Sequence, residues 1–504
     1  MSGICLCLTE STMARNIELA SAYRNEVDLV ELRVDLLSDT EQQRLSDDVR
    51  VVARALSGFE TILTVRRTRD GGQWNRSESD RYALMQSLLA AGFTWIDIES
   101  DGDDLPERLK LAGQARKAGT RVIASRHFMD QVPPDVAREL ALLSRMGDCA
   151  KIAATPAGIE DLRIMLNAAR AHHDPHVVLG MGSYGFPSRV MSHAFGNLFT
   201  FTSAADTRQA ASGHVAPDVL RDLYGHRGCS NNTQYFAVIG NPVAHSKSPE
   251  YHNTRFRADG VDAVYVPVQV DDFAAFMNFA REVPLHGVSV TAPYKEDAAR
   301  SAAVVDEGVS ATGACNTLIR LENGEYRGVN TDIDGFLSPI RELLHKVSGA
   351  TIVGAGGAAR AAAYALMREG KPVLVCNRTR HRADALAAGL NALFGRRGPF
   401  PRAEAGPLPG EKSDLGTYAG LIVQTTSVGL HPDTDGDPIP DYRFRGTEIV
   451  YDMIYSPPVT AVLRRAEAAG CRTINGSGMF TAQAAAQYRL FRSVPAHMRG
   501  THGR

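Results

Sequence analysis

The chain has 504 residues, which is more than one ordinary hydrophobic core accommodates, so we expect at least two domains. Its 44% hydrophobic and 22% charged residues are typical of globular proteins and exclude long disorder. The 55 Lys plus Arg balance 57 Asp plus Glu to a formal charge of -2, which disfavours nucleic acid or a membrane surface as a partner.

Targeting and cysteine patterns indicate the cellular setting. The sequence has no uninterrupted run of about 18 apolar residues, the length that a membrane span requires, and its first residues lack the pattern of a secretory signal. The seven cysteines are scattered and contain no C-x-x-C pair, so we expect neither a disulfide framework nor a zinc or other metal site. We therefore expect a cytoplasmic protein.

Eight short apolar runs alternate with segments of helical spacing over the first 225 residues. The pattern predicts eight buried parallel strands separated by helices, which favours an N-terminal (β/α)8 TIM barrel over the alternative of an open doubly wound sheet. The predicted strands are 4–8, 29–34, 61–65, 95–99, 121–125, 149–154, 176–181 and 198–203.

Charged residues lie inside or directly after these predicted strands, where the chemistry of such a barrel gathers. Burying an unpaired charge costs several kcal/mol, so these groups must pair with one another or line a cavity for a charged ligand. Lys151 lies among Cys149, Ala150, Ile152 and Ala153, an apolar setting that favours a neutral, nucleophilic amine. A lysine that binds an anion at the barrel rim is an equally weighted alternative. The full set is Glu31, Arg33, Arg66, Asp97, Glu99, His127 and Lys151.

Five segments in this region together resemble type I 3-dehydroquinate dehydratase: ELRVD (31–35), LTVRRTRDGG (63–72), SRHF (125–128), KIAATP (151–156) and MGSYGFPSRVMSHAFGNLFTF (181–201). The resemblance implies that Lys151 forms a Schiff base with the C3 ketone of 3-dehydroquinate and that His127 is the general base and acid. It further implies that Glu31, Arg33, Arg66 and Arg189 line the substrate site, with Arg189 on the substrate carboxylate.

The resemblance places Glu99 near His127. Two positions depart from the family pattern: the acid before the paired glycines is Asp70, and the segment that closes over substrate reads QAASGH (209–214). Ala210 and His214 replace a serine and a glutamine there. We expect altered contacts to the substrate hydroxyls.

A polar segment, HRGCSNNT (226–233), marks a predicted boundary. Farther on, TIVGAGGAARAAAYALMREG (351–370) predicts a strand, a glycine turn and a helix, which is typical of a dinucleotide-binding Rossmann domain. The second strand of this unit ends without the acid usual for NAD, and its two arginines favour the 2′-phosphate of NADP. The predicted cofactor-binding residues are Gly354, Gly356, Gly357, Ala358, Asn377, Arg378, Thr379 and Arg382, with Ala359 at the helix-packing position.

Polar clusters in residues 235–490 resemble shikimate dehydrogenase: NPVAHSKSP (241–249), VSVTAPYKE (288–296), ACNT (314–317), VNTDIDG (329–335), QTTSVG (424–429), YDMIYSPPVT (451–460) and GSGMFTAQAA (476–485). The resemblance implies that Lys295 and Asp332 handle the reacting hydroxyl and its proton. Ser289 and Gln424 depart from the family's usual asparagine. The other implied substrate contacts are Ser246, Ser248 and Tyr455 near the carboxylate, and Thr291, Asn316 and Gln483 on the hydroxyls.

The whole chain thus resembles the bifunctional 3-dehydroquinate dehydratase/shikimate dehydrogenase family of the shikimate pathway, which leads to the aromatic amino acids. The resemblance implies that 3-dehydroquinate is dehydrated to 3-dehydroshikimate and then reduced to shikimate with NADPH. Alternatives are a catabolic quinate/shikimate dehydrogenase that uses NAD, and a metabolite sensor without activity. The predicted domains are a barrel (1–225), a linker (226–233), a substrate domain (234–345, with 471–504 returning to it) and an NADP-binding Rossmann domain (346–470).

Overall fold

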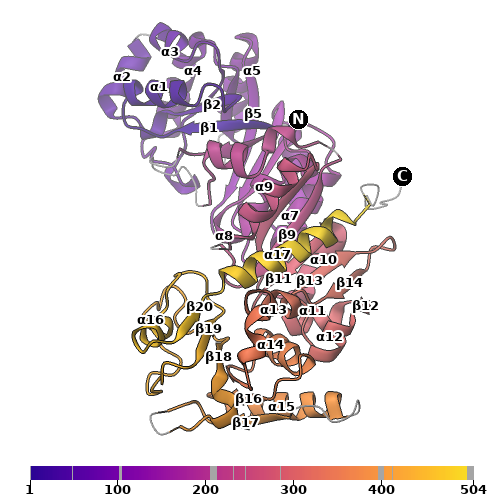
Figure 1. Ribbon diagram of the computed structural model, residues 1–504. Helices are drawn as coiled ribbons and strands as arrows, with labels where there is room; N and C mark the ends of the chain where they lie inside the picture. Colours follow the sequence, from indigo (N-terminus) through magenta and orange to yellow (C-terminus); the bar gives the residue numbers. More distant parts are fainter. Residues whose placement is uncertain are drawn as a thin grey trace. The chain divides into compact units, whose positions relative to one another are not determined.

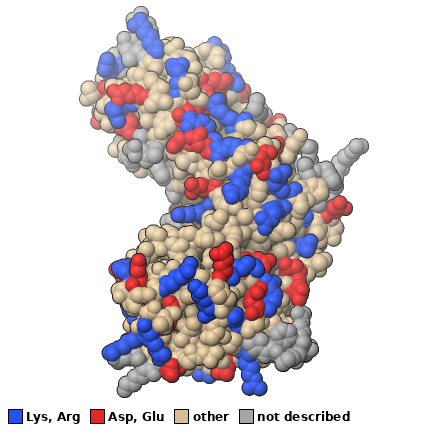
Figure 2. All heavy atoms as spheres, viewed as in Figure 1, with Lys and Arg blue, Asp and Glu red and all other residues tan. Residues whose placement is uncertain are grey.

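The computed structural model describes residues 2–47, 49–101, 105–204, 213–230, 232–244, 246–283, 285–395, 402–410 and 413–495. The chain forms two compact units, one of residues 1–285 and one that begins at His286. Among the described residues, no helix is long and apolar enough to cross a membrane. Basic and acidic side chains are mixed over the face of each unit that Figure 2 shows.

The first unit begins with the predicted barrel of eight parallel strands, drawn in indigo to magenta in Figure 1. The strands follow one another in chain order around the sheet, with β8 beside β1. All eight apolar runs that the sequence indicates form strands, because runs buried on both faces satisfy a parallel sheet covered by helices. The strands are β1 Gly3–Leu8, β2 Leu29–Arg33, β3 Glu60–Thr64, β4 Trp95–Glu99, β5 Arg121–Phe128, β6 Cys149–Ala154, β7 His176–Gly180 and β8 Phe199–Thr202.

Helices alternate with these strands, and several begin at a side-chain cap. The side chains of Thr12, Ser77 and Asp135 accept from the backbone N–H three residues on, at the first turns of α1, α4 and α6. The barrel helices are α1 Met13–Ala22, α2 Asp39–Asp47, α3 Val49–Ala55, α4 Glu78–Leu88, α5 Leu105–Lys117, α6 Val136–Ser144, α7 Ile159–Ala171 and α8 Gly182–Val190.

The barrel nearly closes between β7 and β8, where one bridge joins His176 and Asn197. The side chain of Asn197 extends this seam: its Oδ1 accepts from the N–H of Val178 at 2.8 Å, and its Nδ2 donates to the Val178 carbonyl at 3.0 Å. The side-chain amide of Asn197 therefore makes the two hydrogen bonds to Val178 that the backbone of a neighbouring strand would otherwise make. The predicted (β/α)8 architecture is confirmed over the alternative open sheet.

The first unit continues with β9 (Gln234–Gly240), α9 (Ser248–Ala258), β10 (Ala263–Gln269) and α10 (Phe273–Glu282). The parallel strands β9 and β10 pair along their full lengths. Asp271, between β10 and α10, accepts from the N–H of Ile159 at 3.0 Å and so caps barrel helix α7, whose own N-cap residue is Gly158.

In the second unit, β11 (Leu285–Val290), β13 (Thr317–Arg320) and β14 (Tyr326–Val329) are antiparallel neighbours, and β12 (Val304–Val305) joins β14. Strands β13 and β14 form a hairpin, with Gly324 at a φ of 83° in its turn. The helices here are α11 Lys295–Ser301, α12 Glu307–Thr312, α13 Asp332–Leu337 and α17 Ser477–Arg492.

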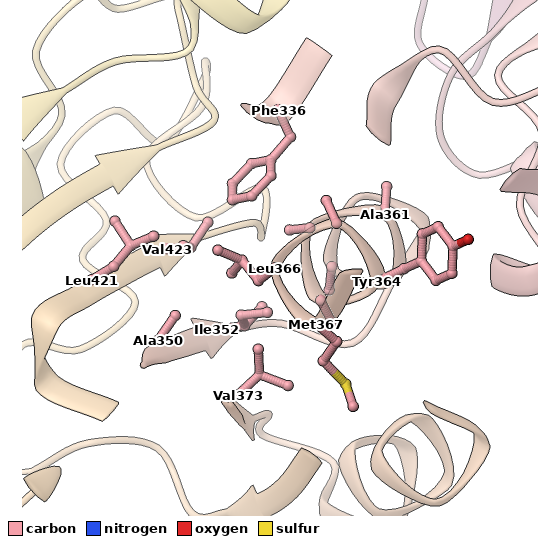
Figure 3. Close-up of a cluster of buried hydrophobic side chains, with 14 of the residues drawn as sticks. Phe336, Ala350, Ile352, Ala361, Tyr364, Leu366, Met367, Val373, Leu421 and Val423 are labelled. Atoms are coloured by element: carbon pink, nitrogen blue, oxygen red, sulfur yellow. The ribbon is translucent and has the colours of Figure 1, made fainter. Parts of the chain in front are cut away.

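The same unit contains the predicted Rossmann domain, a parallel sheet in the order β17-β16-β15-β18-β19-β20. Its core is an alanine-rich face of α14 (Gly357–Arg368) against the sheet, with Ile352, Leu366 and Val423 among the buried side chains (Figure 3). The strands are β15 Ala350–Val353, β16 Val373–Cys376, β17 Ala403–Gly406, β18 Leu421–Gln424, β19 Ile449–Asp452 and β20 Arg472–Ile474, and the other helices are α15 Arg380–Gly395 and α16 Ala461–Ala468.

Residue 285, where the two compact units divide, lies inside the predicted substrate domain (234–345). The units therefore do not follow the boundaries expected from the sequence. Those domain limits stay a prediction.

The asparagine arrangement at the barrel seam recurs in both other sheets. Asn253 exchanges two hydrogen bonds with the backbone of Tyr265 on β10, and Asn391 does the same with Ala403 on β17. Strands β10 and β17 are each the outermost strand of their sheet. An edge strand leaves backbone groups without a partner strand, and these amides satisfy them.

We expect Asn197→Ala to lower the free energy of unfolding of the barrel by about 2 kcal/mol, because it leaves the buried N–H and C=O of Val178 unpaired. The measurement is urea unfolding followed by tryptophan fluorescence, which reports the barrel alone because the only two tryptophans, Trp74 and Trp95, lie in it. Asn391→Ala removes an equivalent pair of bonds from the second unit. If it shifted the fluorescence transition as much as Asn197→Ala, the seam assignment would be wrong.

Candidate functional site

A cavity of about 330 Å³ lies among the carboxyl ends of the barrel strands. All six barrel residues predicted from the sequence to be catalytic or to bind substrate line it: Glu31, Arg33, Arg66, His127, Lys151 and Arg189. Asp70 and His214 line it as well. Ala210 lies outside the described residues.

Lys151 is buried, with 4% of its surface exposed. Its Nζ lies 2.8 Å from Asp97 Oδ2, 3.9 Å from Glu31 Oε1 and 4.1 Å from the centre of the Phe201 ring. This corrects the apolar setting expected from the sequence. Residues 150 and 152 point to the other face of the strand, and the long side chain reaches two carboxylates.

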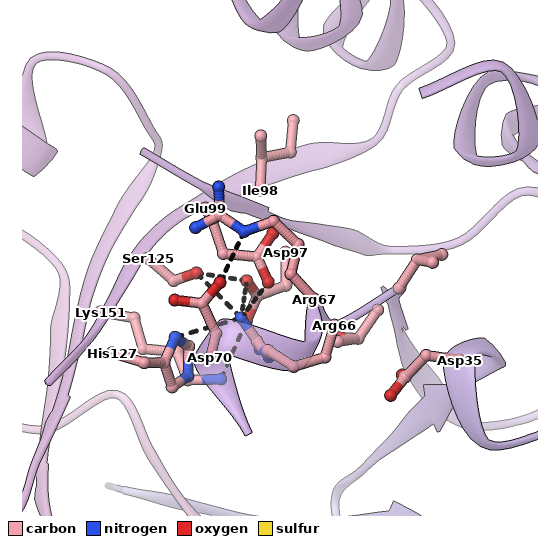
Figure 4. A network of polar contacts seen from close by, with 12 residues as sticks. Asp35, Arg66, Arg67, Asp70, Asp97, Ile98, Glu99, Ser125, His127 and Lys151 are labelled. Atoms are coloured by element: carbon pink, nitrogen blue, oxygen red, sulfur yellow. Dashed lines mark hydrogen bonds and ion pairs between the residues drawn. The ribbon is translucent and has the colours of Figure 1, made fainter. Parts of the chain in front are cut away.

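Arg66 is the centre of the polar network in Figure 4. Its Nη2 donates to Asp97 Oδ2 at 2.9 Å, and its Nη1 lies 2.6 Å from Glu99 Oε1 and 3.2 Å from His127 Nδ1. A guanidinium group only donates hydrogen bonds, so His127 Nδ1 is an acceptor and the neutral ring carries its proton on Nε2. Arg66 thus sets the tautomer of His127.

The surroundings lower the pKa values of both His127 and Asp97, which favours the neutral form of the histidine and the ionised form of the aspartate. Burial, together with the positive charges of Arg66 and Lys151, lowers the pKa of His127 well below its usual 6.5. Burial alone would raise the pKa of Asp97, but Arg66 and Lys151 hold it well below its usual range. The cavity therefore pairs a neutral imidazole with an ionised carboxylate.

Glu99, which the resemblance places near His127, is linked to it through Arg66 Nη1. Its second oxygen accepts from Arg81 Nη1 at 2.5 Å, so the carboxylate lies between two arginines and Arg66 separates it from the histidine. Asp97, one of the buried charges noted from the sequence, had no catalytic or substrate-binding role assigned there, yet it bonds both Arg66 and Lys151. The available signal was its spacing, because Asp97 and Glu99 alternate on β4 and so share one face.

The cavity also contains two further arginines with different partners. Arg33 forms a forked pair with Asp35 through bonds of 2.9 and 2.8 Å. Arg189 Nη1 lies 3.4 Å from the Phe201 carbonyl, and within the described part of the chain its buried Nε has no hydrogen-bond partner. Burial lowers the pKa of Arg189 to about 10. Arg189 is thus a cation available to an anionic ligand.

His214, which departs from the family pattern, is hydrogen-bonded through Nδ1 to Ser203 Oγ. Burial and the charge of Arg189 lower its pKa well below the usual value. A neutral histidine therefore stands in the cavity where the resemblance implies a glutamine.

In the second unit, Lys295 begins α11 and Asp332 begins α13. Lys295 Nζ donates to Asp332 Oδ2 at 2.6 Å, and Asn316 Nδ2 donates to Asp332 Oδ1 at 2.8 Å. The N-terminus of α13 also favours a negative charge. The structure thus brings together the predicted pair Lys295 and Asp332 with the predicted substrate residue Asn316.

Gln487 on α17 was not predicted, and its side-chain amide hydrogen-bonds to Asn316 and to residues beside it. Its Nε2 donates to the Asn316 carbonyl at 3.1 Å and to Thr317 Oγ1 at 2.9 Å, while its Oε1 accepts from Ser289 Oγ at 2.9 Å. This bond explains a serine at position 289. Sequence reasoning could not find Gln487 because it is 171 positions from Asn316 along the chain.

The remaining predicted substrate residues are more dispersed. Half-buried Thr291 follows β11, Gln483 packs on Gly335 of α13, and the ring centres of Tyr455 and Phe480 are 5.0 Å apart. Ser246 and Ser248 belong to the first unit, where the N–H of Ser248 donates to Ser246 Oγ at 3.2 Å at the start of α9.

The glycine turn between β15 and α14 fits a nucleotide. Gly354 has a φ of 121°, and a Cβ there would lie 2.2 Å from Thr425 Oγ1, so only glycine is accommodated. The side chain of Gln424 fixes the adjoining loop through the backbone of Thr426 and Val428. The turn lies between β15 and β18, where the strand order reverses and such sheets bind their ligands.

The other predicted cofactor residues lie around this turn. Gly356 and Gly357 open helix α14, whose first N–H groups suit a phosphate, and Ala358 follows. At the end of β16, Asn377 Nδ2 donates to the Thr379 carbonyl at 2.9 Å. The side chains of Arg378 and Arg382 are exposed there.

Comparisons with known proteins agree with this geometry. The family model for type I 3-dehydroquinase matches residues 4–230, and that for the shikimate dehydrogenase substrate binding domain matches 238–318. The chloroplastic bifunctional 3-dehydroquinate dehydratase/shikimate dehydrogenase of Arabidopsis thaliana is 30% identical over 503 residues, covering 95% of this chain and 80% of that protein. A shikimate dehydrogenase (NADP(+)) of Shouchella clausii is 36% identical over 50% of this chain and 90% of its own length.

Among solved structures, shikimate 5-dehydrogenase from Thermus thermophilus in complex with NADP(H) and shikimate is 34% identical, with a TM-score of 0.44 over 51% of this chain and 93% of that one. The match to the Arabidopsis protein spans both halves of the sequence and both sites described above. The chain belongs to the family of bifunctional 3-dehydroquinate dehydratases/shikimate dehydrogenases.

Proposed function

We propose that the barrel dehydrates 3-dehydroquinate to 3-dehydroshikimate and that the rest of the chain reduces this product to shikimate with NADPH. One observation carries the proposal: a buried lysine paired with an aspartate lies in a cavity beside a neutral histidine and a buried arginine that has an unpaired N–H. An amine, a base and an anion site are what Schiff-base elimination on a hydroxylated keto acid requires.

Lys151 would attack the C3 ketone of the substrate and release its oxygen as water. The resulting iminium keeps a positive charge at Nζ, so the adjacent Asp97 carboxylate would stabilise it. Because Arg66 also binds Asp97, the carboxylate stays compensated while the amine is briefly neutral during the attack. The iminium draws electrons from the neighbouring carbon and makes its C2 proton acidic.

His127 would take the C2 proton on Nδ1, its basic nitrogen, in exchange for the Arg66 contact, and would later return a proton to the C1 hydroxyl as it leaves as water. Water would then hydrolyse the product iminium and free Lys151. A base must be neutral to accept a proton, and the surroundings of His127 keep it so. Arg189 would bind the substrate carboxylate with the help of its Nε–H, which has no hydrogen-bond partner among the described residues. Glu31, Arg33 and Arg66 would contact the substrate hydroxyls from the same cavity.

In the second reaction, Lys295 and Asp332 would deliver the proton that must reach the carbonyl oxygen when shikimate forms. Their separation of 2.6 Å lets a proton pass between them, and Asn316 holds the carboxylate in place. Ser246, Ser248 and Tyr455 would hold the substrate carboxylate, and Thr291, Asn316 and Gln483 its hydroxyls.

NADPH would supply the hydride. The turn at Gly354 and Gly356, with the backbone N–H groups of Gly357 and Ala358, would hold the pyrophosphate at the start of α14. Asn377, Arg378, Thr379 and Arg382 would surround the 2′-phosphate, for which two exposed arginines are suited. The relatives named shikimate dehydrogenase (NADP(+)) support this cofactor. The cytoplasmic location stays a prediction.

The two chemistries should be separable by mutation. We expect Lys151→Met to abolish dehydration and to leave shikimate oxidation unchanged, because methionine is also unbranched and only one atom shorter, and it removes the nucleophile. Lys295→Ala should do the reverse. Each variant is assayed with 3-dehydroquinate and with shikimate plus NADP+, and loss of both activities from either change would contradict the assignment.

The Schiff base can be tested directly. Borohydride added during turnover of 3-dehydroquinate should reduce the iminium, link the ligand covalently to Lys151 and inactivate only the dehydratase. Peptide mass spectrometry locates the modified residue, and Lys151→Met should take up no ligand. Modification of another lysine in the wild-type chain would refute the role of Lys151.

The lowered pKa of His127 predicts the pH dependence of dehydration. Because protonation inactivates a base, and because this group binds its proton only well below pH 6.5, kcat/KM should be constant through neutral pH and fall below 6.5. Removing the positive charge in Arg66→Gln should move the acid limb to higher pH, whereas Arg66→Lys should move it less. An acid limb above pH 6.5 in the wild-type chain would rule out His127 as the base.

Cofactor choice depends on the proposed 2′-phosphate contacts. We expect Arg378→Ala to raise the KM for NADPH by about 10-fold or more and to leave the KM for NADH unchanged, since a charge-assisted hydrogen bond contributes about 1.5–3 kcal/mol. Arg380→Ala is the control, because Arg380 is already engaged with Asp384 and the Ala405 carbonyl. An equal rise in the KM for both cofactors would show that Arg378 does not contact the 2′-phosphate.

A further inference from the structure

Gly357, the first residue of helix α14, lies directly against the side chain of Lys295. A Cβ at Gly357 would be 3.1 Å from Lys295 Cδ, 3.4 Å from Lys295 Cβ and 3.7 Å from Ala314 Cβ. Carbon atoms pack best at about 3.5–4.0 Å, so even one methyl group would press on the lysine side chain. The Lys295 side chain therefore occupies the space that a side chain at position 357 would need.

The three glycines of this turn differ in what surrounds them. A Cβ at Gly354 would collide with Thr425, which makes Gly354 a requirement of the turn itself. At Gly356, which has a φ of -87°, no described atom lies within 4 Å of such a Cβ. Gly356 thus faces open space where a pyrophosphate would approach, whereas Gly357 faces Lys295.

A second contact joins the same two helices. Arg360, one turn along α14, pairs with Glu296 of α11 at 3.3 Å, and Glu296 is the residue after Lys295. The lysine backbone is fixed as well, because its carbonyl accepts from the N–H of Cys315 at 2.8 Å. With its backbone held and one side occupied by α14, Lys295 directs its Nζ to Asp332 at 2.6 Å.

We propose that Gly357 is a positioning residue of the dehydrogenase reaction: its backbone belongs to the turn proposed for the pyrophosphate, and the absence of its side chain serves Lys295 and not the cofactor. The first turn of the helix that would bind the pyrophosphate forms one wall beside Lys295. The position of that helix therefore sets where the lysine amine meets the substrate. This inference rests on the proposed role of Lys295 and Asp332 in proton transfer.

The test compares Gly357→Ala with Gly356→Ala in the full chain. Shikimate oxidation is measured at varied NADP+ and varied shikimate, and the Kd for NADP+ is measured separately by titration calorimetry. The dehydratase activity of the barrel, whose residues neither change touches, measures the amount of active chain. Each kinetic constant is thereby referred to the same number of molecules.

Gly357→Ala should lower kcat for shikimate oxidation by about 10-fold and leave the Kd for NADP+ within about 2-fold, because displacing a reacting group by a fraction of an ångström reduces the rate strongly. Gly356→Ala should do the opposite, raising the Kd for NADP+ with little change in kcat at saturation. Gly357→Val should lower kcat further than Gly357→Ala does. A graded loss of kcat at constant affinity is not expected from destabilisation alone.

Two results would overturn the proposal. One is an unchanged kcat in Gly357→Ala. The other is a loss of NADP+ binding in that variant, with or without activity, which would make Gly357 a cofactor or folding residue. A wild-type chain that binds NADP+ but does not oxidise shikimate would instead refute the proposed dehydrogenase function.

Discussion

Compensation of buried charge is the constraint around which the barrel site is built. Arg66, Asp97, Glu99 and Lys151 are each less than 5% exposed, and an isolated charge at such a depth would cost several kcal/mol. They are stable there because every one of them contacts an opposite charge, with Arg66 bound to both acids. Arg81 extends the network from outside the cavity by binding the second oxygen of Glu99.

This compensation also gives the groups their chemical states. The positive charges of Arg66 and Lys151 keep Asp97 ionised and His127 neutral, so one cluster supplies a stabilising anion and a base. Arg189 differs because it forms no ion pair with a carboxylate of the described residues, so an incoming carboxylate would supply the missing opposite charge. Within the described residues, the charges of Arg66, Asp97, Glu99 and Lys151 are thus paired inside the protein, whereas Arg189 stands where a ligand anion is expected.

A lysine–aspartate pair occurs in both candidate sites, in different surroundings. At the barrel pair, Lys151 and Asp97 are almost fully enclosed and Arg66 adds a further positive charge. At the second pair, 18% of the Lys295 side chain is exposed, and the neutral amide of Asn316 is the added partner of Asp332. The first arrangement suits a covalent bond to an enclosed ligand, and the second suits a proton that must reach a substrate arriving from solvent.

The sequence by itself determined the barrel strands, the glycine turn and the residue types of both sites, because burial patterns, turn glycines and motif spacings are local properties. It did not determine the partners of Lys151, the arginines around Glu99 or the contact of Gln487 with Asn316. Those contacts join residues far apart in the chain, and neighbours in sequence on a strand point to opposite faces. Only the tertiary structure could decide that Lys151 meets a carboxylate and not apolar side chains alone, because the folded sheet brings Asp97 of β4 to within 2.8 Å of Lys151 on β6.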